Sequence, residues 1–486
     1  MTIVLGIDLA TAEARVLAVD ESTGAALAER RAPLPLRERS RTQRAAYGDV
    51  AIELIAAVVA ALGSRSLDVG ALSVTGTSGT VVPVDAAGAP VGDAVLYDDP
   101  RGGDELRMLT EAGLGRRPRG ALARAAWMNA AAGHGPASPA RFVFTPDVVG
   151  AALAGTLLPS DTSHALKSGI DPVAARWDEQ ALATVGLPAE RMPALVAPGR
   201  VIGEVAAAVA SRLGLPPGVQ IVSGMTDGST GQIATGAVAL GDTVGVLGTT
   251  LVLKAVSAHD VVDESAGIYS HVAPDGLFWP GGASNTGAGV LRSGATADID
   301  PAERSAAVAG RGPSPIVSYP LARRGERFPI ADAAFAGFDV LFDGASVPGD
   351  TAPDDADARF RAVYEGVAFV ERLGLERLEA LGVDRRRHHV AGGAAASEVW
   401  NRIRASALGR PVVVTPGTGS ARGAAALAAA ARSGEPLAAV AARFAGPRRT
   451  VAPDPALLEP LDDRYRVFLR ALAERTAAFE HRPIDL

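Results

Sequence analysis

The sequence contains no cysteine. A chain without thiols cannot form a disulfide scaffold, a thiolate nucleophile, a cysteine-ligated zinc site or an iron–sulfur cluster. With 486 residues the chain is long enough to bury a large apolar core without disulfides.

Lysine is almost missing. Only Lys167 and Lys254 occur among the 47 basic residues, so 47 − 2 = 45 are arginine. A phosphate-binding P-loop needs Gly-Lys-Ser or Gly-Lys-Thr, but both lysines follow a leucine. The sequence therefore excludes a P-loop protein and makes the two lysines positions of interest.

An excess of positive charge and long apolar runs are also missing. The 47 basic and 54 acidic residues give a formal net charge of −7, which argues against a nucleic-acid partner. No apolar run reaches the roughly 18 residues of a membrane span, since the stretch 51–62 contains Glu53. Residues 1–6 lack the features of a signal peptide. We therefore expect no nucleic-acid partner, no membrane association and a cytoplasmic location.

The composition that is present is typical of a folded protein. Hydrophobic residues make up 48% and charged residues 21%, with 55 glycines and 33 prolines. At about 150 residues per domain, the length predicts about three domains or two large ones. Strand-like and helix-like segments alternate along the chain, including a long amphipathic helix at about 357–381, which predicts the α/β class.

A strand, a tight turn and a second strand occur twice, half a chain apart. The first pattern spans residues 3–19 and has Thr11 in its turn. The second spans residues 243–255 and has Thr249 in its turn. We interpret this as two lobes of similar build rather than as short repeats. The predicted domains are residues 1–240 and 241–486.

Asp8 ends the first predicted strand, just before the turn that contains Thr11. A carboxylate in this position can hold a hydrated Mg²⁺, while the hydroxyl and the backbone N–H groups of the turn bind phosphate. Judged from the residues alone, Asp8 could also simply organise the turn with its side chain.

Asp227 lies between a predicted strand at 219–223 and a predicted helix. A carboxylate there could accept the proton of a hydroxyl that attacks a phosphate. The alternative is a helix N-cap, because aspartate satisfies free N–H groups at a helix start.

Three turns rich in small residues could bind a nucleotide. Residues 248–250 (Gly-Thr-Thr) could cradle phosphate or merely form a turn. Residues 392–397 lie between a strand and a helix, where small residues admit a flat ring or a phosphate; tight strand–helix packing is the alternative. Residues 417–423 superficially resemble a dinucleotide loop, but too little chain follows them for such a domain.

The histidines give few indications of a metal site. His388 and His389 are adjacent, which does not suit a shared metal-binding face, and we interpret them as a solvated entry to a strand. His164 stands three residues before Lys167.

Taken in order, these features resemble the FGGY family of carbohydrate kinases. The order is an opening hairpin with Asp-x-x-Thr, a mid-chain Thr-Asp-Gly, a second hairpin with Gly-Thr-Thr and a late Gly-Gly before a helix. The resemblance covers essentially the whole chain. It implies an α/β protein with the two-lobed actin-like, or ribonuclease H-like, ATPase fold and a cleft between duplicated domains.

Within that family the sequence is most similar to the D-ribulokinase branch, which is also described as xylulokinase-like. The segment 324–332 (Arg-Gly-Glu-Arg-Phe-Pro-Ile-Ala-Asp) is the most specific match. The other matching segments are residues 76–80, 96–99, 160–161, 164–167, 266–271, 281–285 and 319–321.

The resemblance implies an ATP-dependent phosphotransferase that uses ATP and Mg²⁺. Asp227 matches the general base that takes the proton of the attacking sugar hydroxyl. Asp8 matches the carboxylate near the metal and the phosphates, and Lys254 is expected to be structural. The implied phosphate- and nucleotide-binding residues are Asp8, Thr11, Gly248, Thr249, Thr250, Gly392, Gly393, Ala394 and Ser397. The implied substrate-binding residues are Asp8, Ser78, Tyr97, Asp98, Lys167 and Asp227.

The sequence departs from the family pattern at three positions. Ala10 replaces the glycine of Asp-x-Gly-Thr, which would cost about 1 kcal/mol if that residue needed a positive φ. Ala12 stands where a serine hydroxyl is common. Ala394 occupies the third position of the late glycine run, so the adenine could lie slightly farther out.

The favoured function is a kinase that converts a ketopentose, first D-ribulose, to its 5-phosphate. The alternatives are a D-xylulose or other polyol kinase of the same family, and a sugar- or nucleotide-binding protein that has lost turnover. An actin-like ATPase that serves a protein partner is a further alternative. The expected partner is a small-molecule sugar, and a homodimer is a hypothesis for the assembly.

Overall fold

The computed structural model describes residues 2–34, 36–37, 42–43, 45–114, 118–132, 138–292, 301–343, 355–415 and 419–477. The chain forms two compact units. The first contains residues 1–238, 271–277 and 418–446, and the second contains residues 239–270, 278–417 and 447–486. The boundary between these units differs from the single boundary at residue 240 that the sequence predicts, because residues 271–277 and 418–446 pack with the first unit. The division into kinase lobes at residue 240 stays a prediction.

The first unit is built on a six-stranded sheet with the order β14-β15-β6-β1-β2-β3. Strand β1 pairs antiparallel with β2 and parallel with β6, and β15 also runs parallel to β6. The carboxyl ends of β1, β6 and β15 therefore lie at one edge of the sheet. The strands are β1 (Ile3–Leu9), β2 (Glu13–Asp20), β3 (Ala26–Pro33), β6 (Val69–Gly76), β14 (Val201–Glu204) and β15 (Gln220–Val222).

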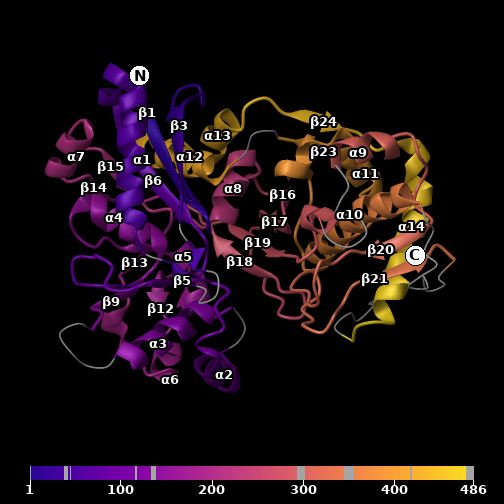
Figure 1. Ribbon diagram of the computed structural model, residues 1–486, viewed down its shortest axis with the longest axis horizontal. Coiled ribbons are helices and arrows are strands. Elements are labelled where there is room, and N and C mark those ends of the chain that lie inside the picture. Colours follow the sequence, from indigo (N-terminus) through magenta and orange to yellow (C-terminus); the bar gives the residue numbers. More distant parts are fainter. Residues whose placement is uncertain are drawn as a thin grey trace. The chain divides into compact units, whose positions relative to one another are not determined.

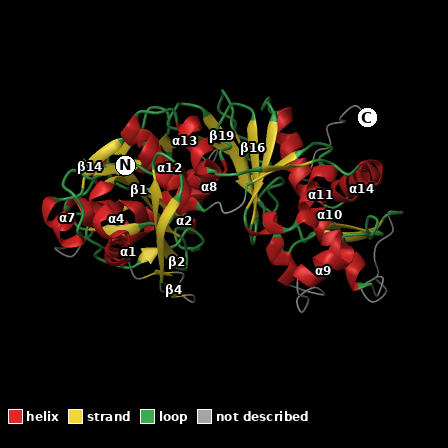
Figure 2. Ribbon diagram, turned by 90° about the horizontal axis from the view of Figure 1, so that it is seen from above, coloured by secondary structure: helices red, strands yellow, loops and turns green. Residues whose placement is uncertain are grey.

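Helices cover both faces of this sheet (Figures 1 and 2). One face carries α1 (Tyr47–Leu62), α4 (Thr145–Ala154) and α7 (Ala207–Leu213), and the other carries α8 (Asp227–Thr235), α12 (Ser420–Ser433) and α13 (Leu437–Phe444).

Side chains alternate between these two faces along β1. The odd-numbered residues from Ile3 to Leu9 belong to the apolar core that also contains residues of α1. Gly6 faces α12, because a Cβ on Gly6 would lie 1.8 Å from the carbonyl oxygen of Ala421. Asp8 is two residues further on the same face. Its carboxylate therefore lies on the side of α8 and α12, away from the apolar core.

The small residues near 417–423 allow close packing of helices. A Cβ on Gly423 of α12 would lie 1.8 Å from the carbonyl oxygen of Thr230 in α8. The glycine at this position lets the two helices touch through their backbones, which is a packing role and needs no dinucleotide. Residues 416–418 lie outside the described residues.

Short strands and helices extend the first unit beyond its sheet. They are β4 (Leu36–Arg37), β5 (Thr42–Gln43), β7 (Val82–Val84), β8 (Ala94–Val95), β9 (Arg141–Val143), β10 (Ser160–Asp161), β11 (Ile170–Asp171), β12 (Arg176–Trp177), β13 (Leu195–Val196), α2 (Gly103–Glu111), α3 (Gly120–Ala132), α5 (Thr162–Ala165) and α6 (Glu179–Thr184).

The second unit contains a sheet with the order β18-β19-β17-β16-β22-β23-β24. Strand β16 pairs antiparallel with β17 and parallel with β22, which is the local topology of β1 with β2 and β6. The strands are β16 (Asp242–Leu247), β17 (Leu251–Ala255), β18 (Tyr269–Val272), β19 (Phe278–Ala283), β22 (Arg387–Ala391), β23 (Val412–Val414) and β24 (Arg449–Val451). A separate pair consists of β20 (Ile316–Tyr319) and β21 (Phe338–Leu341).

The helices of the second unit share an apolar cluster that includes Phe369, Trp400 and Phe468. The long amphipathic helix predicted at 357–381 is confirmed as α10, with Asp355 as its N-cap. The helices are α9 (Pro301–Val308), α10 (Ala356–Ala380), α11 (Glu398–Ala407) and α14 (Pro455–Ala473).

One helical segment in the described residues, Tyr47–Asp68, is long and apolar enough by composition to cross a membrane, with a mean hydropathy of 1.8. A single helix of this kind is weak evidence for a membrane span, because a core helix passes the same test. In this chain its residues Ala51, Ile55 and Val58 pack into the apolar core of the first unit.

Candidate functional site

The two carboxylates with predicted catalytic roles lie at the carboxyl edge of the first sheet. Asp8 is the penultimate residue of β1, and Asp227 is the first residue of α8, just after β15. A parallel bridge between Gly76 and Thr226 joins the end of β6 to the residue before Asp227. Because these strands run parallel, the topology places the two acids near each other although they are far apart in the sequence.

Asp8 is a buried acid with an unusual titration. Its side chain is 8% exposed, and its Oδ1 has no hydrogen-bond partner among the described residues. Burial, the negative charge of Asp227 and that of Glu13 raise the pKa of Asp8 to about 7, against the opposing effect of Arg15. A cation bound to this carboxylate would offset both the cost of burying its negative charge and the repulsion from Asp227.

Asp227 is half-buried at the start of α8. The cap position belongs to Thr226, and the Oδ1 of Asp227 accepts a hydrogen bond from the Gly228 backbone N–H at 2.7 Å. The alternative that Asp227 is the N-cap is therefore wrong. The Ser420 hydroxyl donates to the Asp227 carbonyl oxygen at 3.1 Å, which ties this residue to α12.

The loop after β6 carries the predicted sugar contact Ser78. Its hydroxyl oxygen is buried and has no hydrogen-bond partner among the described residues. The next residue, Gly79, has a φ of +93°, and its carbonyl oxygen accepts a hydrogen bond from the Arg124 Nη2 at 2.9 Å. This bond to a buried guanidinium fixes the loop, and a polar ligand could satisfy the free hydroxyl.

Two further predicted substrate residues lie against the same loop. The Lys167 Cδ lies 3.6 Å, and the Tyr97 Cβ 3.5 Å, from the position that a Cβ would take on Gly79. Tyr97 is 40% exposed, and the neighbouring Asp98 is also exposed. Within the described residues, the Lys167 side chain makes no hydrogen bond or ion pair, so its ammonium group remains available to a ligand.

The turn between β1 and β2 contains the predicted phosphate contact Thr11, which is half-buried. The Ala10 N–H donates to the Glu13 carbonyl oxygen at 3.0 Å, which closes the turn. Among the described residues only Ala175 combines a side chain with a positive φ. Ala10 therefore fits this turn without the strain considered from the sequence, while the exposed Ala12 offers no hydroxyl.

In the second unit, the Gly248-Thr249-Thr250 turn joins β16 to β17. The Gly248 N–H donates to the Thr250 carbonyl oxygen at 3.1 Å, and the Gly248 and Thr249 carbonyl oxygens accept bonds from Ala288 and Gly289. The Thr249 side chain is exposed. The backbone of this turn is thus held by bonds from Ala288 and Gly289, while Thr249 remains exposed.

The second unit also brings the late glycine run beside this hairpin. Gly392 has a φ of +89°, and a Cβ there would lie 2.5 Å from the Leu247 carbonyl oxygen at the end of β16. Gly393 is exposed and Ala394 half-buried in the short helix η7 (Gly393–Ala396). Ser397 caps α11, because its hydroxyl oxygen accepts the Trp400 N–H at 3.2 Å. The predicted phosphate and adenosine segments are therefore neighbours within this unit.

Known protein families account for most of the chain. Residues 3–234 match the N-terminal domain of the FGGY family of carbohydrate kinases, and residues 243–432 match its C-terminal domain. The chain belongs to the FGGY family of carbohydrate kinases. The resemblance found in the sequence is thereby confirmed, and this family consists of phosphotransferases that act on an alcohol group.

Individual relatives of this FGGY chain are distant. A gluconokinase from Bacillus subtilis (strain 168) is 25% identical over 254 residues, which cover 49% of this chain and 48% of that protein. The chain therefore matches only about half the length of this relative and of a second gluconokinase, from Bacillus licheniformis. A xylulose kinase from Bacillus subtilis (strain 168) is 24% identical over 460 residues, 88% of each chain.

Solved structures confirm the predicted fold class. The structure of a xyloylose kinase from Brucella ovis matches with a TM-score of 0.87 at 23% identity, over 97% of this chain and 99% of that one. The FGGY chain therefore has the two-domain actin-like ATPase fold of these sugar kinases.

Two buried charge clusters of the FGGY chain were not identified from the sequence. In the first unit, His164 and Asp161 form an ion pair at 2.7 Å. In the second, Arg404 and Glu371 form one at 2.6 Å, joined by His388. The spacing of Asp161 and His164 at the start of a helical turn was the only local indication of either cluster.

The prediction that His388 and His389 are solvated is wrong. Their side chains are 4% and 1% exposed. They lie in β22, which is paired on both sides, by β16 and β23. Two adjacent polar residues do not indicate, from the sequence alone, that their strand lies between two others in a sheet.

Proposed function

We propose that this FGGY chain is an ATP-dependent sugar kinase that phosphorylates a ketopentose, D-ribulose in preference to D-xylulose, at its C5 hydroxyl. The single observation that carries the proposal is the pair Asp8 and Asp227 at the carboxyl edge of the first sheet, with the pKa of Asp8 raised by burial and by Asp227. Two nearby acids with separated pKa values can take separate roles in one reaction.

In the proposed reaction Asp227 is the general base. Its carboxylate takes the proton of the sugar hydroxyl, the hydroxyl oxygen bonds to the γ-phosphorus, and the bond from that phosphorus to the β–γ bridging oxygen breaks to release ADP. The Gly228 N–H donates to one carboxylate oxygen of Asp227 and thereby orients the carboxylate. Ser78, Tyr97, Asp98 and Lys167 would hold the sugar.

Kinases of this family use ATP and a divalent metal. Mg²⁺ in phosphoryl-transfer sites is held by one or two carboxylates, water and substrate phosphates. Asp8 fits this pattern, because its buried Oδ1 lacks a partner and its charge is disfavoured without a cation. A bound Mg²⁺ would stabilise the charge on the transferred phosphoryl group.

The nucleotide would be held by both units. Thr11 and the N–H groups of the first hairpin would bind phosphate oxygens, as would Gly248, Thr249 and Thr250 in the second hairpin. Gly392, Gly393, Ala394 and Ser397 would hold the adenosine. That both units act on one pair of substrates is part of the proposal.

The test is ADP release by the full chain with MgATP and a panel of D-ribulose, D-xylulose, D-gluconate and glycerol. We expect the highest kcat/KM with D-ribulose and the next with D-xylulose. Binding of ATP without sugar-dependent ADP release on any member of the panel would reject the proposal.

The second candidate is a sugar- or nucleotide-binding protein that has lost turnover. The exposed Ala12 favours it, because the first phosphate hairpin offers one hydroxyl fewer. Calorimetry separates the two candidates. Sugar binding that yields no product and is unchanged in Asp227→Asn would support the binding protein.

A further inference from the structure

A single buried helical turn contacts both the sugar loop and the proposed base. This turn, α5, follows β10 and has Asp161 as its N-cap. The Asp161 Oδ1 accepts the His164 backbone N–H at 2.8 Å, and its Oδ2 lies 2.7 Å from the His164 Nδ1. The His164 side chain is 1% exposed, so it cannot contact a substrate directly.

On its other side, His164 reaches the end of β6. Its Nε2 lies 3.2 Å from the carbonyl oxygen of Gly76, two residues before Ser78. A carbonyl oxygen only accepts, so the Nε2 carries a proton and donates to Gly76. When the Nδ1 is protonated as well, the ring is an imidazolium that donates to Asp161 on its other side.

The neighbouring residue on the turn reaches the start of α8. The Ser163 hydroxyl oxygen accepts the backbone N–H of Thr226 at 3.2 Å, and it lies 2.9 Å from the His271 Nδ1. Thr226 directly precedes Asp227. The Ser163 hydroxyl also donates to the Thr226 Oγ1 at 3.5 Å, a second contact with the residue before Asp227.

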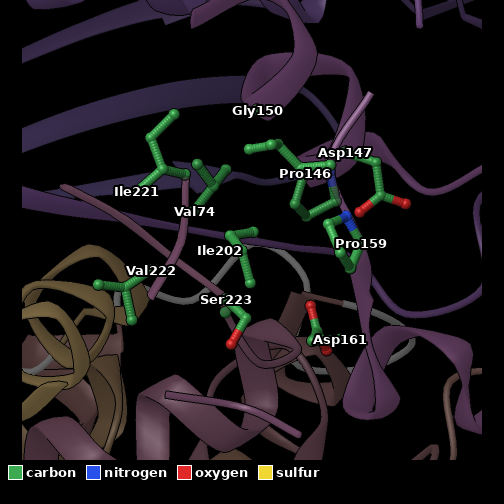
Figure 3. A pocket seen from close by; sticks show the side chains of 12 residues that line it. Val74, Pro146, Asp147, Gly150, Pro159, Asp161, Ile202, Ile221, Val222 and Ser223 are labelled. Carbon is green, nitrogen blue, oxygen red and sulfur yellow. The ribbon is translucent and has the colours of Figure 1, made fainter. Parts of the chain in front are cut away.

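A second acid lies behind this cluster. Asp147 of α4 accepts the Phe144 N–H at 2.8 Å, and burial raises its pKa to about 7. A cavity of about 20 Å³ is lined by Asp147 and Asp161, which is space for about one water molecule. Figure 3 shows both carboxyl groups on the same side of this cavity, with Pro159 between them.

We propose that the Asp161–His164 pair, together with Ser163, is a positioning device that fixes the Ser78 loop and Asp227 relative to each other. His164 holds the Gly76 carbonyl and Ser163 holds the Thr226 amide, so one rigid turn sets both sides of the sugar position. This inference rests on the proposed function. It makes His164 and Ser163 positioning residues, which act through the loop and the base.

The device has a defined dependence on pH. Burial disfavours the charged ring, but Asp161, Asp147 and the Gly76 carbonyl together raise the pKa of His164 above its ordinary value. Asp161 and Asp147 are the titratable groups that face it. The ring's bond to Gly76 is therefore fully charge-assisted below the raised pKa and weakens as the pH rises through it.

The experiment compares the full-length wild type with His164→Gln, Ser163→Ala and the control His259→Gln. His259 lies in the second unit near Ser257, outside the proposed machinery. The first readout is deuterium uptake of residues 76–80 and 224–228 in the free protein. We expect faster uptake than in the wild type in His164→Gln and Ser163→Ala, and wild-type uptake in the control.

The second readout is turnover of D-ribulose between pH 6 and 9.5. Small misplacements of reacting groups can cost about a hundredfold in rate, so we expect kcat to fall about ten- to hundredfold in His164→Gln, with little change in the KM for ATP. We expect the wild-type rate to fall at alkaline pH, as the His164 ring loses its proton, and we expect this fall to be absent in His164→Gln. If the ion pair were purely structural, its substitution would leave the fall in rate at alkaline pH in place.

Wild-type uptake in both substituted proteins would overturn the inference, as would faster uptake with unchanged kcat and pH profile. If His164→Gln does not fold, Ser163→Ala decides alone, since it removes no charge. A wild type without sugar turnover would reject the proposed function instead, and deuterium uptake would then still decide whether the turn fixes the loop and α8.

Discussion

At the scale of single residues, Asp8 is the most informative side chain of the first unit. Its pKa of about 7 lies above the ordinary value of 3.8, so the folded chain holds a proton that the unfolded chain releases. Stability is therefore lost as the pH rises between these two values, because the fold disfavours the ionised form.

Replacing Asp8 by asparagine removes this penalty. At about 1.4 kcal/mol per pKa unit, we expect Asp8→Asn to raise the free energy of unfolding by roughly 2 to 4 kcal/mol more at pH 8 than at pH 4. Denaturant titrations at the two pH values measure the difference. The exposed Asp275→Asn in the same unit is the control and should show no such difference. An equal effect of Asp8→Asn at both pH values would contradict the assigned pKa.

At the scale of elements, the two hairpins β1–β2 and β16–β17 share one local topology but differ in their turns. The second offers two threonines, and the first offers Thr11 followed by the exposed Ala12. Because Ala12 is exposed, a hydroxyl at this position could donate to a phosphate oxygen.

We therefore expect Ala12→Thr to lower the KM for ATP about tenfold, because hydrogen bonds to charged groups contribute about 1.5–3 kcal/mol. Ala12→Val has nearly the same shape without the hydroxyl and should leave the KM at the wild-type value. Steady-state kinetics on the two variants would count against a phosphate at this turn if threonine and valine behaved alike.

The elements of the second unit are joined by a buried charge cluster. Burial alone would raise the pKa of Glu371 in α10, but Arg404 of α11 and the bond from His388 lower it to about 2. The Arg404 Nη2 also donates to the Gly245 carbonyl oxygen of β16 at 3.0 Å. A Cβ on Gly245 would lie 1.7 Å from the Glu371 Oε1, so only glycine fits this position.

Removing one member of this cluster leaves an unpaired charge buried in the core. We expect Arg404→Met to destabilise the chain by about 3–5 kcal/mol, measured by chemical unfolding. The double variant Arg404→Met/Glu371→Gln should recover a large part of the loss, because the stranded carboxylate is then absent. A double variant as unstable as the single one would show that packing, and not the unpaired charge, causes the loss.

Element by element, the sequence supported many of these features and missed others for physical reasons. Hydrophobic periodicity predicted both hairpins and the helix α10, because each depends on residues that are close in sequence. The buried ion pairs could not be predicted in this way. Asp161 with His164 and Glu371 with Arg404 are polar residues whose burial is set by elements far away in the chain.

At the scale of the whole molecule, the order of weak motifs predicted the family, which the matches to both FGGY domains confirm. The packing of residues 418–446 with the first unit was not predicted. The small residues of α12 indicate close packing, but they do not indicate the partner, which is the face of β1 that holds Gly6. The sugar specificity stays a prediction, because the named relatives include both gluconokinases and a xylulose kinase.

The central claim is that Asp227 accepts the proton of a sugar hydroxyl during transfer from ATP. The most direct test is sugar-dependent ADP release by wild type and Asp227→Asn at equal ATP saturation. General bases contribute about 10²- to 10⁴-fold, so the account predicts a loss of that size with ATP binding and unfolding midpoint unchanged. A folded Asp227→Asn variant that turns over sugar within a few-fold of wild type would contradict it.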